Sequence, residues 1–235
     1  MLLSIDNVTA GYGHAPVLTD ICMTVEKGEL ICIIGPNGAG KSTVLRTVAG
    51  QLIPSQGRIT FKGEDISKMT LAQRGKRGLV FIPQGMNIFP NLTLIENLEI
   101  SGTLLEDKQI LNRRIQQVLE RYPVLDKKKH FFARNLSGGE RQLLALSRSI
   151  ILKPDLVLLD EPSLGLAPIV VDMIFDQISD IAKSGSSVLL VEQNARKGLS
   201  VAHKGYVLEL GKNRLTGTGQ ELLESDEVRR LYLGG

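Results

Sequence analysis

Residues 30–42 read Leu-Ile-Cys-Ile-Ile-Gly-Pro-Asn-Gly-Ala-Gly-Lys-Ser, an apolar run followed at once by the pattern G-x-x-x-x-G-K-S. The run predicts a buried strand, and the segment Lys41–Ala49 predicts a helix that Gly50 ends. Backbone N–H groups of such a glycine-rich loop surround phosphate oxygens at the positive end of the helix. The stretch therefore predicts a strand–loop–helix unit that binds a nucleoside triphosphate.

The side chains of this loop have distinct expected roles. Lys41 can reach the β- and γ-phosphates, and the Ser42 hydroxyl is placed for Mg²⁺. The residues expected to bind the nucleotide are Gly35, Pro36, Asn37, Gly38, Ala39, Gly40, Lys41, Ser42 and Thr43. A glycine-rich turn without a ligand is the alternative, and the loop alone does not identify a reaction.

The composition is that of a globular protein. Its 235 residues, 43% of them hydrophobic and 23% charged, suit one large α/β domain or a core with a subdomain. A net charge of +3 gives no reason to expect a nucleic-acid partner, and no apolar run approaches a transmembrane length. The N-terminus lacks the features of a signal peptide, so we expect a cytosolic location. Cys22 and Cys32 are expected to be reduced core residues.

Two kinds of strand pattern are present. Residues 2–8 and 21–26 alternate apolar and polar, which predicts half-buried antiparallel strands that Arg58–Phe61 joins. Four continuous apolar runs predict strands buried on both faces of a parallel sheet. They are Leu30–Ile34, Leu79–Ile82, Leu156–Leu159 and Val188–Val191.

Helices are predicted between these strands. The clearest, Pro168–Ser184, should pack on the sheet. Between Gln84 and Leu136 the sheet pattern disappears, and helices are expected after Thr93 and over Asp107–Tyr122. We therefore predict a single domain over 1–235, in which 1–84 and 137–235 form the core with its β subdomain and 85–136 form a helical subdomain.

A pair of carboxylates ends the third apolar run. Asp160 and Glu161 lie at the carboxyl end of a predicted parallel strand, where ligands of such sheets bind. Neighbouring residues of an extended chain point in opposite directions, so the two should have different tasks. Asp160 is the candidate for holding Mg²⁺ beside Ser42, and Glu161 for polarising the attacking water. A solvated turn before Pro162 is the alternative.

A second glycine-containing motif, Leu136–Gln142, precedes a helix expected over Gln142–Leu152. Ser137 and Glu140 have the spacing of a capping box. A helix start alone explains Gly138 and Gly139 poorly, because glycine costs about 1 kcal/mol relative to alanine in a helix. The two glycines make sense if the backbone admits an anion, which predicts a second phosphate contact.

The motifs 35–43 (G-P-N-G-A-G-K-S-T), 136–142 (L-S-G-G-E-R-Q) and 156–163 (L-V-L-L-D-E-P-S) together resemble the nucleotide-binding subunit of an ABC transporter, over the whole chain. The resemblance implies an α/β fold, with a RecA-like P-loop NTPase core, an antiparallel β subdomain and an inserted helical subdomain. It implies ATP and Mg²⁺ as ligands. It also implies two subunits enclosing two nucleotides, with Ser137, Gly138, Gly139 and Glu140 at the ATP of the opposing subunit.

Further roles follow from the resemblance. Tyr12 matches the aromatic residue that stacks on adenine, and Gln84 matches the glutamine that senses Mg²⁺ and the attacking water. Residues 85–90 would then lie near the membrane partner. The implied catalytic residues are Glu161, Lys41, Gln84 and Gln193, and the implied metal residues are Ser42, Gln84 and Asp160.

Two positions depart from the family pattern. Ala167 stands where an aspartate is usual, and Gln193 stands where a histidine is usual. A glutamine can donate an N–H to a phosphate oxygen but cannot carry a positive charge. These departures put the usual contacts across the subunits and to the γ-phosphate in question.

The same departures, with the ending at 217–235, are similar to an ATP-binding subunit of high-affinity branched-chain amino-acid importers. The resemblance implies a second ATP-binding subunit, identical or different, two membrane permeases and, indirectly, a solute-binding protein. It places the chain at the cytoplasmic face of the membrane. Urea and amide importers share much of the pattern and remain an alternative.

Three other classes of protein share some of these motifs. A soluble ABC ATPase of iron–sulfur cluster assembly has similar motifs, although Ala167 and Gln193 disfavour it. A DNA-maintenance ATPase would need a long coiled coil between the motifs, and residues 43–136 show no sustained heptads. A P-loop kinase leaves Ser137–Glu140 unexplained.

Overall fold

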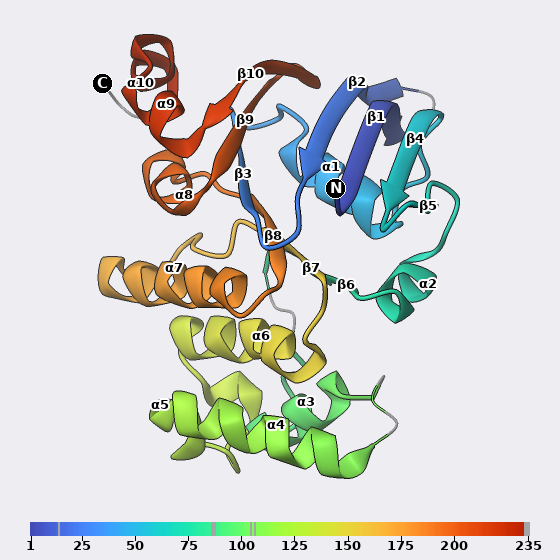
Figure 1. The fold of residues 1–235 in the computed structure, drawn as a ribbon. Helices are drawn as coiled ribbons and strands as arrows, with labels where there is room; N and C mark the ends of the chain where they lie inside the picture. Colours follow the sequence, from blue (N-terminus) through green and yellow to red (C-terminus); the bar gives the residue numbers. More distant parts are fainter. Residues whose placement is uncertain (14, 86–87, 104, 106, 233–235) are drawn as a thin grey trace.

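A computed structural model describes residues 1–13, 15–85, 88–103, 105 and 107–232. Two β-sheets form the upper part of the molecule as drawn in Figure 1, and helices cover the lower face of the larger sheet. Residues 86 and 87, within the segment expected near the membrane partner, lie outside the described residues. The predicted α/β class is confirmed by this arrangement.

The smaller sheet is antiparallel, with the order β2-β1-β4-β5. Its strands are β1 (Leu3–Tyr12), β2 (Ala15–Val25), β4 (Gln56–Phe61) and β5 (Glu64–Asp65). Alternation places Ile21, Met23 and Val25 in the core, as expected. The prediction for Cys22 was wrong, because the same alternation turns its side chain to the exposed face, where its thiol donates to Asn7. Cys32 is buried, as predicted.

The larger sheet has the order β10-β9-β3-β8-β7-β6. Five strands are parallel and β10 pairs antiparallel with β9. The strands are β3 (Leu30–Ile34), β6 (Leu79–Ile82), β7 (Leu156–Asp160), β8 (Ser187–Val191), β9 (Lys204–Glu209) and β10 (Lys212–Thr218). Every residue of β3, β6, β7 and β8 is buried, which confirms that continuous apolar runs form the centre of a parallel sheet.

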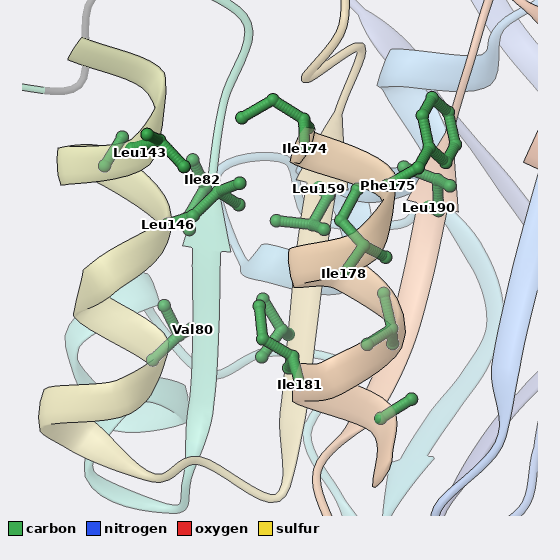
Figure 2. Packing of buried hydrophobic residues seen from close by; sticks show 14 of the residues in the cluster. Val80, Ile82, Leu143, Leu146, Leu159, Ile174, Phe175, Ile178, Ile181 and Leu190 are labelled. Atoms are coloured by element: carbon green, nitrogen blue, oxygen red, sulfur yellow. The ribbon is translucent and has the colours of Figure 1, made fainter. Parts of the chain in front are cut away.

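Helices bury both faces of this sheet. Helix α1 (Lys41–Ala49) lies between the two sheets, and α6 (Gly138–Leu152) and α7 (Pro168–Lys183) cover the opposite face (Figure 1). Figure 2 shows Ile174, Ile178 and Ile181 of α7 directed at the sheet. At the C-terminal side α8 (Ala195–Val201), α9 (Gly219–Glu224) and α10 (Asp226–Tyr232) complete the fold.

The region between Gln84 and Leu136 is helical, as expected. It contains α3 (Leu94–Ser101), α4 (Lys108–Arg121), α5 (Pro123–Asp126) and a 3₁₀ turn, η1 (Ala133–Asn135). Helices α3 and α4 pack on α6 rather than on the sheet. Helix α6 begins at Gly138, four residues before the expected start, because the Ser137–Glu140 capping box closes its first turn. None of the described helices is long and apolar enough to cross a membrane.

An arginine holds the C-terminal end of α1. Arg74, on α2 (Leu71–Lys76), is fully buried, and its guanidinium donates to the carbonyl oxygens of Thr47 and Val48 at 2.8 and 2.7 Å. It also donates to Met69 and Ser67. Burial lowers the pKa of Arg74 to about 10, so it remains charged at neutral pH. A cation therefore stabilises the negative end of the helix whose other end follows the phosphate loop.

Candidate functional site

The loop between β3 and α1 curls around an ammonium group. Lys41 is only 5% exposed, and its Nζ donates to the carbonyl oxygens of Gly35 at 2.9 Å and Pro36 at 3.2 Å. Gly35 has a φ of +149°, and a Cβ there would lie 2.2 Å from the Leu208 carbonyl oxygen. Only glycine fits this position, and the resulting loop holds the lysine charge where phosphate oxygens would bind.

Ser42 and Asp160 meet at the start of α1 and the end of β7. Ser42 Oγ donates to Asp160 Oδ1 at 2.7 Å, while Asp160 Oδ2 is buried and has no hydrogen-bond partner among the described residues. Burial raises the pKa of Asp160, although the Ser42 hydrogen bond opposes the shift. A hydroxyl beside an unsatisfied carboxylate oxygen fits a hard cation such as Mg²⁺, which prefers oxygen ligands.

Glu161 lies beside Lys41 and Gln84. Its Oε1 is 4.0 Å from Lys41 Nζ, and its Oε2 accepts a hydrogen bond of 3.0 Å from Gln84 Nε2. The two carboxylates accept from different side chains, Ser42 for Asp160 and Gln84 for Glu161, but the extended chain assumed in the prediction is not present. Strand β7 ends at Asp160, and Glu161 adopts a left-handed conformation with φ +47°. Burial, with the nearby Asp160 charge, raises the pKa of Glu161 against the effect of Lys41.

The second glycine motif begins α6. Within the described ranges, no hydrogen bond or ion pair joins residues 137–140 to residues 35–43. Ser137 Oγ accepts from the Glu140 backbone N–H, and the Glu140 carboxylate accepts from the Ser137 N–H and from Lys128. The capping box is confirmed, and the role of these residues at a nucleotide stays a prediction.

The two glycines of this motif have different surroundings. A Cβ at Gly139 would lie 2.6 Å from Val170 Cγ1, so close packing of α6 on α7 already requires this glycine. A Cβ at Gly138 would be 3.5 Å from Leu166, an ordinary contact. The sequence predicts that both glycines admit an anion, but within the chain packing already accounts for Gly139, and only Gly138 lacks another reason. Gly138, Gln84 and Glu161 line one cavity of about 520 Å³.

Tyr12 and Gln193 lie at the surface. Tyr12 is 49% exposed, and its hydroxyl accepts from Arg46 Nη1 at 2.9 Å. Gln193 is exposed and lines a cavity of about 480 Å³ together with Leu164 and Asn194. Ala167 is the N-cap residue of α7 and makes no side-chain cap. The nucleotide roles of Tyr12 and Gln193 stay predictions.

Glu192 was not singled out from the sequence, although it is buried beside the site. It is 1% exposed, and its carboxylate accepts from the backbone N–H and hydroxyl of Ser163, at 3.1 and 2.9 Å. The available signal was its position directly after a continuous apolar run, the same position that drew attention to Asp160 and Glu161.

Comparison with known families agrees with this geometry. The sequence profile described as ABC transporter matches residues 18–164, from within β2 to the loop after Glu161. The chain belongs to the ABC transporter family. It is therefore an ATPase, and the RecA-like core with its antiparallel and helical additions is confirmed.

Individual members of the ABC transporter family align over the full chain. The high-affinity branched-chain amino acid transport ATP-binding protein BraG of Pseudomonas aeruginosa is 41% identical and covers 100% of both chains. A probable branched-chain amino acid transport ATP-binding protein, LivF, of Archaeoglobus fulgidus is 35% identical over 97% of this chain and 96% of its own. The lipopolysaccharide export system ATP-binding protein LptB of Haemophilus influenzae is 34% identical over 99% of this chain and 97% of its own.

A solved ABC structure supports the ligand as well as the fold. The ADP conformation of an ATP-binding cassette of an ABC transporter superposes with a TM-score of 0.84 at 26% identity, covering 100% of this chain and 99% of that one. As a member of this ATPase family, the chain binds adenine nucleotide, and the place of that nucleotide at the loop around Lys41 stays a prediction.

Proposed function

We propose that this ABC subunit hydrolyses MgATP to drive the uptake of branched-chain amino acids through partner permeases. The observation that carries the proposal is the full-length likeness to BraG, whose name describes this transport. The archaeal LivF relative supports the same substrate class. Lower identity to LptB gives less reason to propose export.

The side chains around Glu161 suit water attack on the γ-phosphate. Lys41 would neutralise the β- and γ-phosphate charge, since its ammonium is already held within the loop. Glu161, whose pKa is raised mainly by burial, would accept hydrogen bonding from the attacking water. Gln84 donates to Glu161 and would orient that carboxylate. Gln193 would add a neutral hydrogen bond to the γ-phosphate.

The residues that would hold Mg²⁺ are Ser42 and Asp160, with Gln84 nearby. The support is the buried Asp160 Oδ2, which lacks a partner among the described residues and would be satisfied by the ion or its water. When bound, Mg²⁺ would neutralise charge on the β- and γ-phosphate oxygens. No cluster of three or more His, Cys, Asp or Glu occurs in the described part of the chain, so phosphate and water oxygens would complete the coordination.

A second nucleotide-binding subunit is part of the proposal. Ser137, Gly138 and Gly139 begin α6, where N–H groups and the helix dipole favour an anion, yet no hydrogen bond or ion pair joins them to this chain's phosphate loop in the described residues. They would contact ATP on the opposing subunit, with Glu140 closing their capping box. We place the assembly at the cytoplasmic face of the membrane, with two permeases and a solute-binding protein.

The test uses cells whose own copy of this subunit carries Glu161→Gln. Uptake of radiolabelled leucine should fall to the level of a deletion strain, while urea uptake should be unchanged. ATP hydrolysis by the purified variant should be roughly 10²–10⁴-fold slower, with ATP still bound. Loss of urea uptake with normal leucine uptake would move the proposal to the urea importers. A variant that hydrolyses ATP at the wild-type rate would refute the role of Glu161.

A further inference from the structure

The carboxylate of Glu192 joins the ends of two neighbouring strands. Its Oε1 accepts from the Ser163 backbone N–H at 3.1 Å, and its Oε2 accepts from the Ser163 hydroxyl at 2.9 Å. Oε2 also accepts from the Asn194 N–H at 3.3 Å. Ser163 lies two residues after Glu161, and Asn194 follows Gln193. One side chain thus fixes the loops that carry both Glu161 and Gln193.

This arrangement is unusual because the carboxylate is buried without a cation. Glu192 is 1% exposed, and no lysine or arginine forms an ion pair with it in the part of the chain that the structure describes. Burial, together with the nearby Glu161 charge, raises its pKa against the effect of the Ser163 and Asn194 hydrogen bonds. A buried charge is costly unless hydrogen bonds satisfy it, so the three donors define one position for the side chain.

Helix α8 packs closely on the same side chain. A Cβ at Gly198 would lie 2.6 Å from Cys32 Sγ and 3.3 Å from Glu192 Cβ. A glycine at this point of α8 therefore lets the helix approach β3 and Glu192 together. Glu192 therefore meets α8 near its Cβ, and Ser163 and the Asn194 N–H at its carboxylate.

Glu161 needs such support. Its φ of +47° is a strained conformation for a residue other than glycine, and strained residues persist only where the surroundings hold them. On one side the Glu161 N–H donates to the Val191 carbonyl at 2.9 Å. On the other side Ser163 is held by Glu192. Both supports come from the end of β8, from two successive residues.

We propose that Glu192 is a positioning residue for hydrolysis: through Ser163 and the Asn194 N–H it holds Glu161 and Gln193 in register over the γ-phosphate. The inference rests on the proposed role of Glu161. It assigns to Glu192 no contact with nucleotide, so it predicts an effect on turnover and none on ATP affinity.

The experiment compares four variants of the full chain by single-turnover ATP hydrolysis, ATP affinity and thermal unfolding. Glu192→Ala should hydrolyse ATP roughly 10–100-fold more slowly, the range for a catalytic group displaced by about 1 Å, with ATP affinity within about twofold of wild type. Glu192→Gln keeps an acceptor for the Ser163 N–H and gains a donor to its hydroxyl, but it places an N–H₂ group against the Asn194 N–H, so it should recover only part of the rate. Ser163→Ala should have an intermediate hydrolysis rate, because the hydrogen bond from its backbone N–H to Glu192 remains.

Ser186→Ala is the matched control. Ser186 is also a buried serine, and its hydroxyl donates to the Pro154 carbonyl at 2.7 Å, at the opposite ends of β7 and β8. It should lose thermal stability without losing hydrolysis. This control separates a general loss of packing from a specific loss of positioning.

Three outcomes would overturn the inference. One is wild-type turnover in Glu192→Ala, and another is equal loss of turnover in Glu192→Ala and Glu192→Gln, which would show that the Ser163 contacts do not support the rate. The third is a rate loss in Ser186→Ala as large as that in Ser163→Ala. If Glu192→Ala does not fold, the hydrolysis rates of Ser163→Ala and Glu192→Gln still test the inference, and wild-type rates in both would overturn it. Failure of the proposed function is separate, because it would appear as wild-type turnover in Glu161→Gln.

Discussion

Ser42 and Asp160 are 118 positions apart in the sequence, yet Ser42 Oγ donates a hydrogen bond of 2.7 Å to Asp160 Oδ1. The contact joins the first turn of α1 to the end of β7. It leaves the second carboxylate oxygen of Asp160 buried and without a partner among the described residues. The pair therefore offers a hydroxyl and an acceptor oxygen to one cation, and this arrangement can be tested.

Asp160→Asn should raise the Mg²⁺ concentration that gives half-maximal ATP hydrolysis by roughly 10–100-fold, the usual cost of disturbing a residue around a bound metal. Asparagine keeps the acceptor for Ser42 but loses the negative charge. The measurement is a Mg²⁺ titration at saturating ATP. Asp155→Asn, just before the other end of β7, is the control and should leave the titration unchanged. Equal curves for Asp160→Asn and wild type would refute the assignment.

Lys41→Ala should weaken ATP binding by at least about tenfold, because hydrogen bonds to a charged group contribute roughly 1.5–3 kcal/mol each. The change removes the Lys41 ammonium, which donates to the Gly35 and Pro36 carbonyl oxygens within the loop. Titration with a fluorescent ATP analogue measures the affinity. Lys62→Ala removes a lysine whose ion pair is with Asp155, away from the loop, and should bind the analogue normally. Undiminished affinity in Lys41→Ala would contradict the loop's role.

Tyr12→Ala should weaken ATP by about 1–3 kcal/mol, the contribution of stacking a base on an aromatic ring. Tyr12→Phe keeps the ring and removes only the hydroxyl that accepts from Arg46, so it should bind ATP normally. Calorimetric titration of both variants separates the two parts of the side chain. Equal losses would show that the link to Arg46, and not stacking, supports the nucleotide.

Gln193→Ala should slow hydrolysis by an amount equivalent to about 0.5–1.5 kcal/mol, the net value of a neutral hydrogen bond, and should still bind MgATP. Gln193→His, which restores the residue usual in the family, should hydrolyse at least as fast as wild type. Steady-state rates at saturating ATP compare the three proteins. A complete loss of nucleotide binding in Gln193→Ala would mean that the residue supports the fold of its loop.

Glu192→Gln should change how stability depends on pH. Because burial raises the folded-state pKa of Glu192, the native protein binds more protons than the unfolded chain, and its free energy of unfolding falls as pH rises. The stabilising contribution is present below the unfolded value of about 4.3 and is lost as pH rises through the higher folded pKa. The wild type should therefore lose stability relative to Glu192→Gln across this interval, as urea unfolding at several pH values would show. A constant difference would contradict a raised pKa.

Local patterns predicted the elements that form the site. Leu30–Ile34 is wholly buried as the central strand, and the glycine loop and α1 follow it as the sequence indicated. Ser137 and Glu140 form the capping box that their spacing predicted. These features are local, because a buried strand, a phosphate loop and a helix cap each depend on a few consecutive residues.

Other features depend on pairing between distant segments. The Glu192–Ser163 contact requires that Asp160 pair with Val191 in the ladder of β7 and β8, and no local pattern fixes that register. The left-handed conformation of Glu161 and the packing of Gly139 on Val170 have the same origin. Exposure of Cys22 was predictable from alternation in its strand, but the general preference of cysteine for the interior was given more weight.

The hold of Arg74 on the C-terminal end of α1 has a mechanical consequence. Arg74 holds the Thr47 and Val48 carbonyls, so the helix cannot recede when an anion binds at its front without breaking buried hydrogen bonds to a charged group. The helix therefore stays in place when the anion binds and does not move along its axis. Displacement caused by nucleotide should then appear in the segments that follow β6 and β7, which carry Gln84 and Ser163. Through these segments it should reach the helices on the opposite face of the sheet.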